Sequence, residues 1–208
     1  PFNSLKLIPL ELSKLFYSHT KDFPNKTQLA IAVTHNGKTD YYGIILENDS
    51  VKSIENYNQV FEIGSITKVF TSTVLASLVE EGKINLSDNI NPFYNFKFKN
   101  KLKITFESLA NHTTGLPRLP DNLDLSNEIN PYKNYDEKKL ELYLRKNLTL
   151  ASSTKTVYSY SNLGAGLLGH TLALSQRTDF NELLQIKFFD KYQMNNSFTD
   201  SHKVAHKL

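Results

Sequence analysis

One β-hairpin is predicted near the start of the 208-residue chain, and the sequence after it is almost wholly helical. This arrangement constrains the fold more than any other feature of the sequence. Residues 29–34 and 41–46 are β-prone runs, and Asn36-Gly37 between them is the residue pair of a tight hairpin turn. A hairpin alone is marginal in water and needs a larger sheet. Residues 1–60, with an amphipathic helix over 9–19, are therefore expected to form the sheet part of an α+β fold.

From residue 61 onward, apolar side chains recur at helical spacing. The stripe formed by Val69, Phe70, Val74, Leu75, Leu78 and Val79 predicts a long helix that Gly82 ends. Four more helices are predicted over 105–111, 136–146, 161–176 and 179–192, while the stretch 121–135, rich in Asn, Asp and Pro, is expected to be a loop. Residues 61–208 are therefore predicted to be the mainly helical part of the same domain.

Composition excludes several classes of protein. The 24 basic and 21 acidic residues are mixed along the chain, which argues against a nucleic-acid-binding protein. There is no cysteine, so disulfides and cysteine chemistry are excluded, and a periplasmic or secreted location is expected. No apolar run approaches the roughly 20 residues of a transmembrane helix. The six His are scattered, so we expect neither a metal nor another cofactor.

Ser65 and Lys68 form a Ser-x-x-Lys motif at the start of the longest predicted helix. Residues three apart share a helix face, so the Lys68 amine can reach the Ser65 hydroxyl. A serine becomes a nucleophile when a neighbouring base takes its proton, and free N–H groups at a helix N-terminus can stabilise an oxyanion. The alternative is that Ser65 only caps the helix.

Tyr160 and Asn162 precede a second, glycine-rich helical run, residues 163–169. A phenol placed just before a helix can project into a cleft, and a cation such as Lys68 would have to lower its pKa for it to act as a base. The amide of Asn162 can donate and accept, which suits it to hold a substrate amide and to tether the lysine. The alternative is a core tyrosine beside a helix-capping Asn.

Two further segments repeat these patterns. Ser152-Ser153-Thr154-Lys155 is a second Ser-x-x-Lys, but a β-branched polar stretch follows it instead of an apolar helix. Tyr132-Lys133-Asn134 is a second Tyr-x-Asn, within the predicted polar loop. Neither is predicted to be part of the site.

Four segments together resemble a known family. The segments are residues 61–71 around Ser65, residues 81–88, residues 109–117 with the sequence Leu-Ala-Asn-His-Thr-Thr-Gly-Leu-Pro, and residues 160–164. In this order they are similar to motifs of serine β-lactamases and penicillin-binding proteins, above all the class C β-lactamase, D-Ala-D-Ala carboxypeptidase and esterase group. The resemblance implies a β-lactamase/transpeptidase-like fold in one catalytic domain.

The resemblance also implies roles for individual residues. Ser65 is the expected nucleophile of a serine acyl-transfer hydrolase that acts on a β-lactam, a D-alanyl peptide or an ester through an acyl-enzyme. Lys68 and Tyr160 are expected to share proton transfer, and Asn162 to contact the substrate. His112 is expected to order a loop at the cleft edge. The alternative function is a penicillin-binding sensor or pseudoenzyme without turnover.

The family's third motif, Lys or His followed by x-Gly on a late strand, has no counterpart after the helices. His35-Asn36-Gly37 fits the pattern only superficially, because it precedes Ser65 and occupies the predicted hairpin turn. The sequence is therefore expected to be the N-terminal portion of a longer protein.

Overall fold

The computed structural model describes residues 8–48, 50–56, 59–128, 130–150 and 157–200. The described residues divide into two compact units, one up to Glu62 and the other from Ile63 onward. Each unit contains its own hydrophobic core. The mixture of a helix-rich unit and an antiparallel sheet confirms the predicted α+β class.

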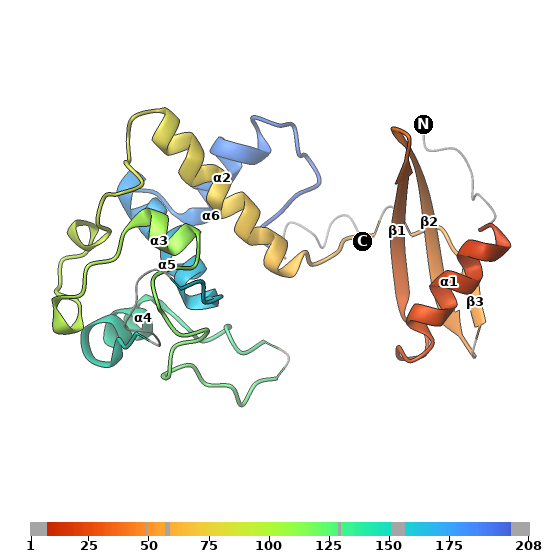
Figure 1. Cartoon of the computed structure of the whole chain (residues 1–208), viewed down its shortest axis with the longest axis horizontal. Helices are drawn as coiled ribbons and strands as arrows, with labels where there is room; N and C mark the ends of the chain where they lie inside the picture. The colour runs from red at the N-terminus through yellow and green to blue at the C-terminus, as the bar shows by residue number, and fades with distance from the viewer. Residues whose placement is uncertain (1–7, 49, 57–58, 129, 151–156, 201–208) are drawn as a thin grey trace. The chain divides into compact units, whose positions relative to one another are not determined.

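The first unit is a three-stranded antiparallel sheet with one helix beside it (Figure 1). The helix α1 spans Leu10–Thr20, and the strands are β1 (Gln28–His35), β2 (Lys38–Glu47) and β3 (Ser50–Ser53), in the order β1-β2-β3. The predicted hairpin is confirmed. Strand β3 was not predicted, because its sequence Ser-Val-Lys-Ser has one apolar residue and no visible alternation.

The turn of the hairpin has the backbone that its sequence requires. Asn36 and Gly37 both have positive φ, 48° and 71°, and His35 pairs with Lys38 in the ladder. This is the geometry of a two-residue hairpin loop whose twist matches the flanking strands. His35-Asn36-Gly37 is therefore a turn.

The core of this unit forms where α1 covers one face of the sheet. Phe16 of α1 packs against Tyr42 and Ile44 of β2, with apolar residues of β1 around them. On the neighbouring position of β2, Gly43 lies directly under the chain that follows β3. The Ile54 N–H donates to the Gly43 carbonyl over 2.9 Å, so the absence of a side chain at Gly43 permits this close approach.

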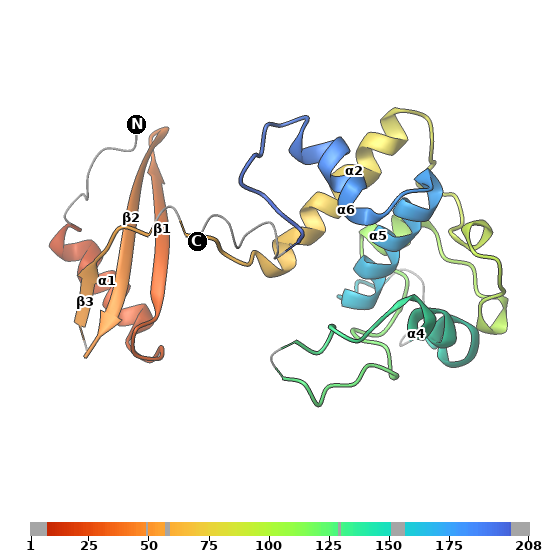
Figure 2. The same ribbon diagram turned by 180° about the vertical axis from the view of Figure 1, so that it is seen from behind.

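The second unit is built from helices (Figures 1 and 2). They are α2 (Thr67–Glu80), α3 (Phe106–Ala110), α4 (Glu137–Leu142), α5 (Asn162–Gln176) and α6 (Phe180–Leu184). The ends of α4 and α6 continue as π-helical turns, Tyr143–Asn147 and Gln185–Phe189. All five predicted helices of this part are present, and the described residues of 121–135 form turns and bends, as expected of a loop.

Side-chain caps explain where these helices begin. Thr105, Asp136, Ser161 and Asp179 each accept a hydrogen bond from a backbone N–H three residues later. Gly82 ends α2 as predicted, with φ of 68° and a hydrogen bond from its N–H to the Val79 carbonyl. Local sequence therefore accounts for the starts of α3, α4, α5 and α6 and for the end of α2.

The core of the second unit surrounds α5. Leu167, Leu168 and Leu172 of α5 are almost completely buried, with Leu75 and Leu78 of α2 in the same cluster. Within the described ranges, no helix combines the length and apolar composition needed to cross a lipid bilayer.

Candidate active site

Ser65 and Lys68 lie next to each other at the start of α2. Gly64, with φ of 51°, opens a 3₁₀ turn over Gly64–Ile66, and α2 begins at Thr67. The Lys68 ammonium donates to Ser65 Oγ over 3.1 Å. Ser65 is exposed and Lys68 half-buried, so the hydroxyl is open to a ligand while the amine is held beneath it.

Tyr160 reaches the same hydroxyl from the other end of the sequence. Its phenol oxygen is 2.7 Å from Ser65 Oγ, and Lys68 Nζ lies 4.8 Å from the centre of its ring. The structure therefore brings together Ser65, Lys68 and Tyr160, the three residues that the sequence predicted to share a site. Ser65 and Tyr160 are 95 residues apart in the chain.

Two cationic side chains, those of Lys68 and Arg118, lie near the phenol of Tyr160. Its hydrogen bonds with Lys68 and Ser65 and the nearby charges of Lys68 and Arg118 hold the pKa of Tyr160 below its usual range. The guanidinium of Arg118 lies 5.2 Å from the centre of the Tyr160 ring. A cation favours the charged form of a neighbouring phenol, so Tyr160 gives up its proton more readily than an isolated tyrosine.

The backbone after Tyr160 is fixed by Ser161, whose side chain is completely buried. Ser161 Oγ accepts from the Gly164 N–H, as the N-cap of α5, and donates to the Pro117 carbonyl over 2.6 Å. The carbonyl of Arg118 accepts from the N–H groups of Asn162 and Leu163. The loop after α3 and the first turn of α5 are thus locked together, which sets the direction of Tyr160.

His112 orders this loop, as predicted. Its Nδ1 accepts from the Ser161 N–H over 3.2 Å, and its carbonyl accepts from the Ser159 N–H over 2.8 Å. The imidazole lies 4.8 Å from the ring of Tyr160, in a tilted arrangement. Burial, and then the charge of Lys68, lower the pKa of His112, which favours the neutral imidazole that can accept this bond.

Asn162 lies in the first turn of α5 and contacts a residue that the sequence did not indicate. Its Nδ2 donates to the Tyr132 hydroxyl over 3.3 Å. Its Oδ1 is buried and has no donor among the described residues. No hydrogen bond between Asn162 and Lys68 occurs among the described residues, where Lys68 donates to Ser65 and Asn162 to Tyr132.

Sequence reasoning missed two residues of this region. Arg118 directly follows the Gly-Leu-Pro of the loop motif, but nothing in its spacing indicates that it faces Tyr160. Tyr132 was set aside with the Tyr-x-Asn of the polar loop, although its hydroxyl reaches Asn162. The second Ser-x-x-Lys, residues 152–155, lies outside the described residues.

Known proteins of one family match this chain. The family model described as Beta-lactamase matches residues 21–207. A beta-lactamase of Pseudomonas fluorescens is 29% identical over 173 residues, which cover 82% of this chain and 45% of that protein. Beta-lactamase-like protein 4 of Dictyostelium discoideum is 40% identical over 125 residues, 56% of this chain and 21% of the relative. The chain thus spans less than half the length of these curated relatives.

Solved structures share the fold. A beta-lactamase/D-alanine carboxypeptidase from Yersinia pestis matches with a TM-score of 0.70 and 21% identity, over 89% of this chain and 52% of that one. An octameric penicillin-binding protein homologue from Pyrococcus abyssi also matches with a TM-score of 0.70 and 21% identity, over 94% of this chain and 45% of that one. The resemblance inferred from four motifs is confirmed, and the chain belongs to the beta-lactamase family, with the fold of class C beta-lactamases and penicillin-binding proteins.

Proposed function

We propose that the protein is a serine acyl-transfer hydrolase that attacks an amide, lactam or ester with Ser65. The observation that carries this proposal is the position of Ser65 Oγ, 2.7 Å from the Tyr160 hydroxyl and 3.1 Å from Lys68 Nζ. A nucleophile within hydrogen-bonding reach of a base, which a third group orients, is the arrangement that nucleophilic catalysis needs.

The direction of proton transfer follows from the chemistry of the three groups. A lysine ammonium only donates, so Ser65 Oγ accepts from Lys68 and is free to direct its own proton toward the Tyr160 oxygen. We therefore assign Tyr160 as the immediate proton acceptor and Lys68 as the group that lowers its pKa. When Ser65 bonds to the substrate carbonyl carbon, its proton passes to the phenolate form of Tyr160, which becomes the neutral phenol.

The same groups complete the reaction. The Ser65 N–H, at the start of the helix, donates to the oxyanion of the tetrahedral intermediate. Tyr160 returns the proton to the leaving group as the carbonyl–leaving-group bond breaks, which gives the Ser65 acyl-enzyme. Water then hydrolyses the ester bond, with the same pair taking its proton. Asn162, two residues after Tyr160, is proposed to contact the substrate.

Because the chain spans about half the length of its relatives, the activity, substrates and partners of the whole protein form part of this proposal. The proposed partner is a small-molecule or peptide substrate, either a β-lactam, a D-alanyl peptide or an ester. Membership of the beta-lactamase family supports a periplasmic or secreted location, which fractionation of the source cells tests.

The test follows acylation and turnover separately. Intact-mass spectrometry after incubation with penicillin measures the adduct, and a chromogenic cephalosporin, a D-Ala-D-Ala peptide and p-nitrophenyl acetate measure turnover. A transient adduct with turnover, both lost in Ser65→Ala, is expected. A persistent adduct without turnover would instead identify a penicillin-binding sensor. Labelling that survives Ser65→Ala would refute Ser65 as the nucleophile in either function.

A further inference from the structure

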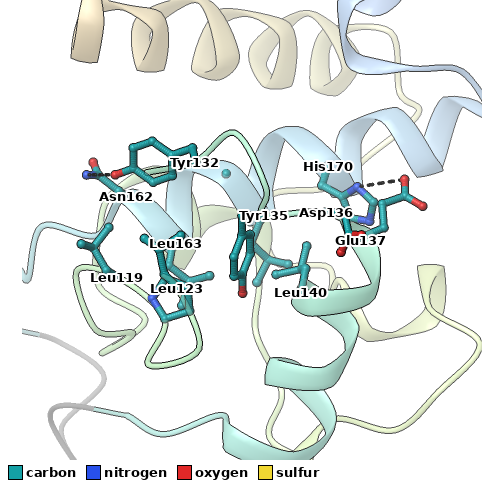
Figure 3. Close-up of a pocket in the computed structure, with 13 residues that line it drawn as sticks. Leu119, Leu123, Tyr132, Tyr135, Asp136, Glu137, Leu140, Asn162, Leu163 and His170 are labelled. Atoms are coloured by element: carbon teal, nitrogen blue, oxygen red, sulfur yellow. Dashed lines mark hydrogen bonds and ion pairs between the residues drawn. The ribbon is translucent and has the colours of Figure 1, made fainter. Parts of the chain in front are cut away.

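A cavity of about 250 Å³ opens beside Asn162, between α5, the start of α4 and the loop that precedes it (Figure 3). Its wall is mainly apolar, made by Leu119, Pro120, Leu123, Leu140, Leu163 and Leu167. None of the roles proposed above for Ser65, Lys68 and Tyr160 uses this space.

Apart from Tyr135, the polar residues labelled in Figure 3 lie toward the two ends of the cavity. Asn162, which is two residues after Tyr160, lies at one end and is hydrogen-bonded to Tyr132. His170 and Glu137 lie at the other end, with 3.9 Å between His170 Nδ1 and Glu137 Oε1. Leucine side chains and Tyr135 lie between the two ends in Figure 3. The cavity is therefore mainly apolar, and Asn162 at one of its ends is two residues from Tyr160 of the candidate active site.

The length of the cavity can be read from α5. Asn162 and His170 are eight residues apart on the helix, and Gly166 between them lies on the same face. At a rise of 1.5 Å per residue, the two ends are separated by about 12 Å. This length suits an unbranched chain of medium length better than a compact ring.

We propose that this cavity binds the unbranched apolar acyl chain of the substrate, so that medium-chain acyl esters or amides are the preferred substrate class. This inference rests on the proposed function, because it takes the chain from a substrate whose carbonyl carbon is attacked by Ser65. Each methylene that leaves water adds roughly a fourfold gain in binding.

Gly166 provides a direct way to fill the cavity. It lines the space, and a Cβ added there would meet no atom within 4 Å. Gly166→Phe therefore places a ring in the cavity without a clash at its Cβ, and Gly166→Ala is the matched control that leaves most of the space open. Alanine also favours the helix over glycine.

The experiment compares hydrolysis of p-nitrophenyl octanoate and p-nitrophenyl acetate by the full chain. We expect the octanoate to have the higher kcat/KM by at least about tenfold, from burial of several methylenes. Gly166→Phe should lower that kcat/KM by at least about tenfold and change the acetate value by less than about twofold, while Gly166→Ala preserves both. An octanoate-to-acetate ratio that Gly166→Phe leaves unchanged would refute the acyl site.

A binding measurement keeps the two proposals separate. Octanamide titrated calorimetrically into Ser65→Ala should bind, and the additional change Gly166→Phe should abolish the heat signal. Octanamide binding without turnover of any ester, D-Ala-D-Ala peptide or cephalosporin would support the cavity and reject the proposed hydrolase. Acetate turnover that depends on Ser65, with no octanamide binding, would support the hydrolase and overturn the acyl site.

Discussion

His112 accepts a hydrogen bond at Nδ1 from the backbone N–H of Ser161, the residue directly after Tyr160, over 3.2 Å. A neutral imidazole has one acceptor nitrogen and one donor, so this bond leaves the proton on Nε2. His112 does not touch Ser65 in any described contact, but it holds the backbone from which the Tyr160 phenol extends. We therefore expect His112 to act as a positioning residue.

The first prediction concerns this role. His112→Ala removes the acceptor, and we expect penicillin labelling of Ser65 to slow by up to about a hundredfold because the phenol is misplaced. His112→Asn should restore most of the rate, since Asn can accept a hydrogen bond and tolerates the positive φ of 60° at this position.

The pH profile of labelling separates positioning from a general loss of stability. In the unchanged protein, labelling should fall as the pH drops through the lowered pKa of His112, because the imidazolium cannot accept from Ser161. His112→Asn should lack this inflection. An identical pH profile in both proteins would contradict the positioning role.

The second prediction concerns the ionisation of Tyr160. Lys68→Gln should raise the pKa of Tyr160 toward its ordinary value, and Arg118→Gln should raise it by less, since Lys68 is the larger cause of the lowering. The chain has no tryptophan, so tyrosinate absorbance can be followed directly as the pH rises. The difference between each protein and its Tyr160→Phe counterpart isolates this phenol among the 11 tyrosines. No shift in Lys68→Gln would refute the assignment.

The third prediction concerns the buried side chain of Ser161. Ser161→Ala removes both the cap of α5 and the donor to the Pro117 carbonyl, and it should lower the free energy of unfolding by about 1–2 kcal/mol. Ser175→Ala, which loses a bond to Leu172 and one from Gln176, both within the same helix, is the control and should change it by less than about 0.5 kcal/mol. Urea unfolding followed by circular dichroism measures both. Equal effects would show that Ser161 has no special role.

The fourth prediction concerns Gly43 in β2. A Cβ at this position would overlap the Ile54 carbonyl oxygen and lie 2.5 Å from Asn56 Oδ1. Gly43→Ala should therefore destabilise the protein by about 1–3 kcal/mol through overpacking. Gly166→Ala, with open space around the new methyl, should be neutral or stabilising by up to about 1 kcal/mol. Thermal unfolding of the two variants side by side measures the difference, and equal melting temperatures would contradict the close approach.

The fifth prediction concerns the ion pair between Glu81, directly after α2, and Lys187, in the π-helical turn that follows α6. Hydrogen bonds from Lys187 and Lys83 lower the pKa of Glu81 from 4.5 to about 2. A carboxylate with a lowered pKa stabilises the folded state above pH 4.5, and this contribution is lost as the pH falls through about 2. Glu81→Gln should therefore flatten the pH dependence of the unfolding free energy in this window. Glu80→Gln is the neighbouring control, and an equally steep curve in both variants would contradict the prediction.

The sequence by itself determined the local structure and the reactive pair at the start of α2. The Asn36-Gly37 turn needs only residues that tolerate positive φ, the stripe after Ser65 needs only a 3.6-residue period, and Ser65 and Lys68 meet because they are three apart on one helix. Strand β3 was not predicted, because its four residues show no alternation of apolar and polar side chains from which a strand could be recognised.

Only the tertiary structure decided which distant groups meet. Tyr160 reaches Ser65 across 95 residues, and Arg118 faces the Tyr160 ring, because Ser161 and His112 join a loop to the first turn of α5. The acyl cavity likewise depends on residues such as Leu119 and Leu140 that have no common spacing. The spacing of residues in a sequence predicts which side chains share a face of one helix or strand. It does not predict which helices, strands and loops pack against one another, and these contacts depend on that packing.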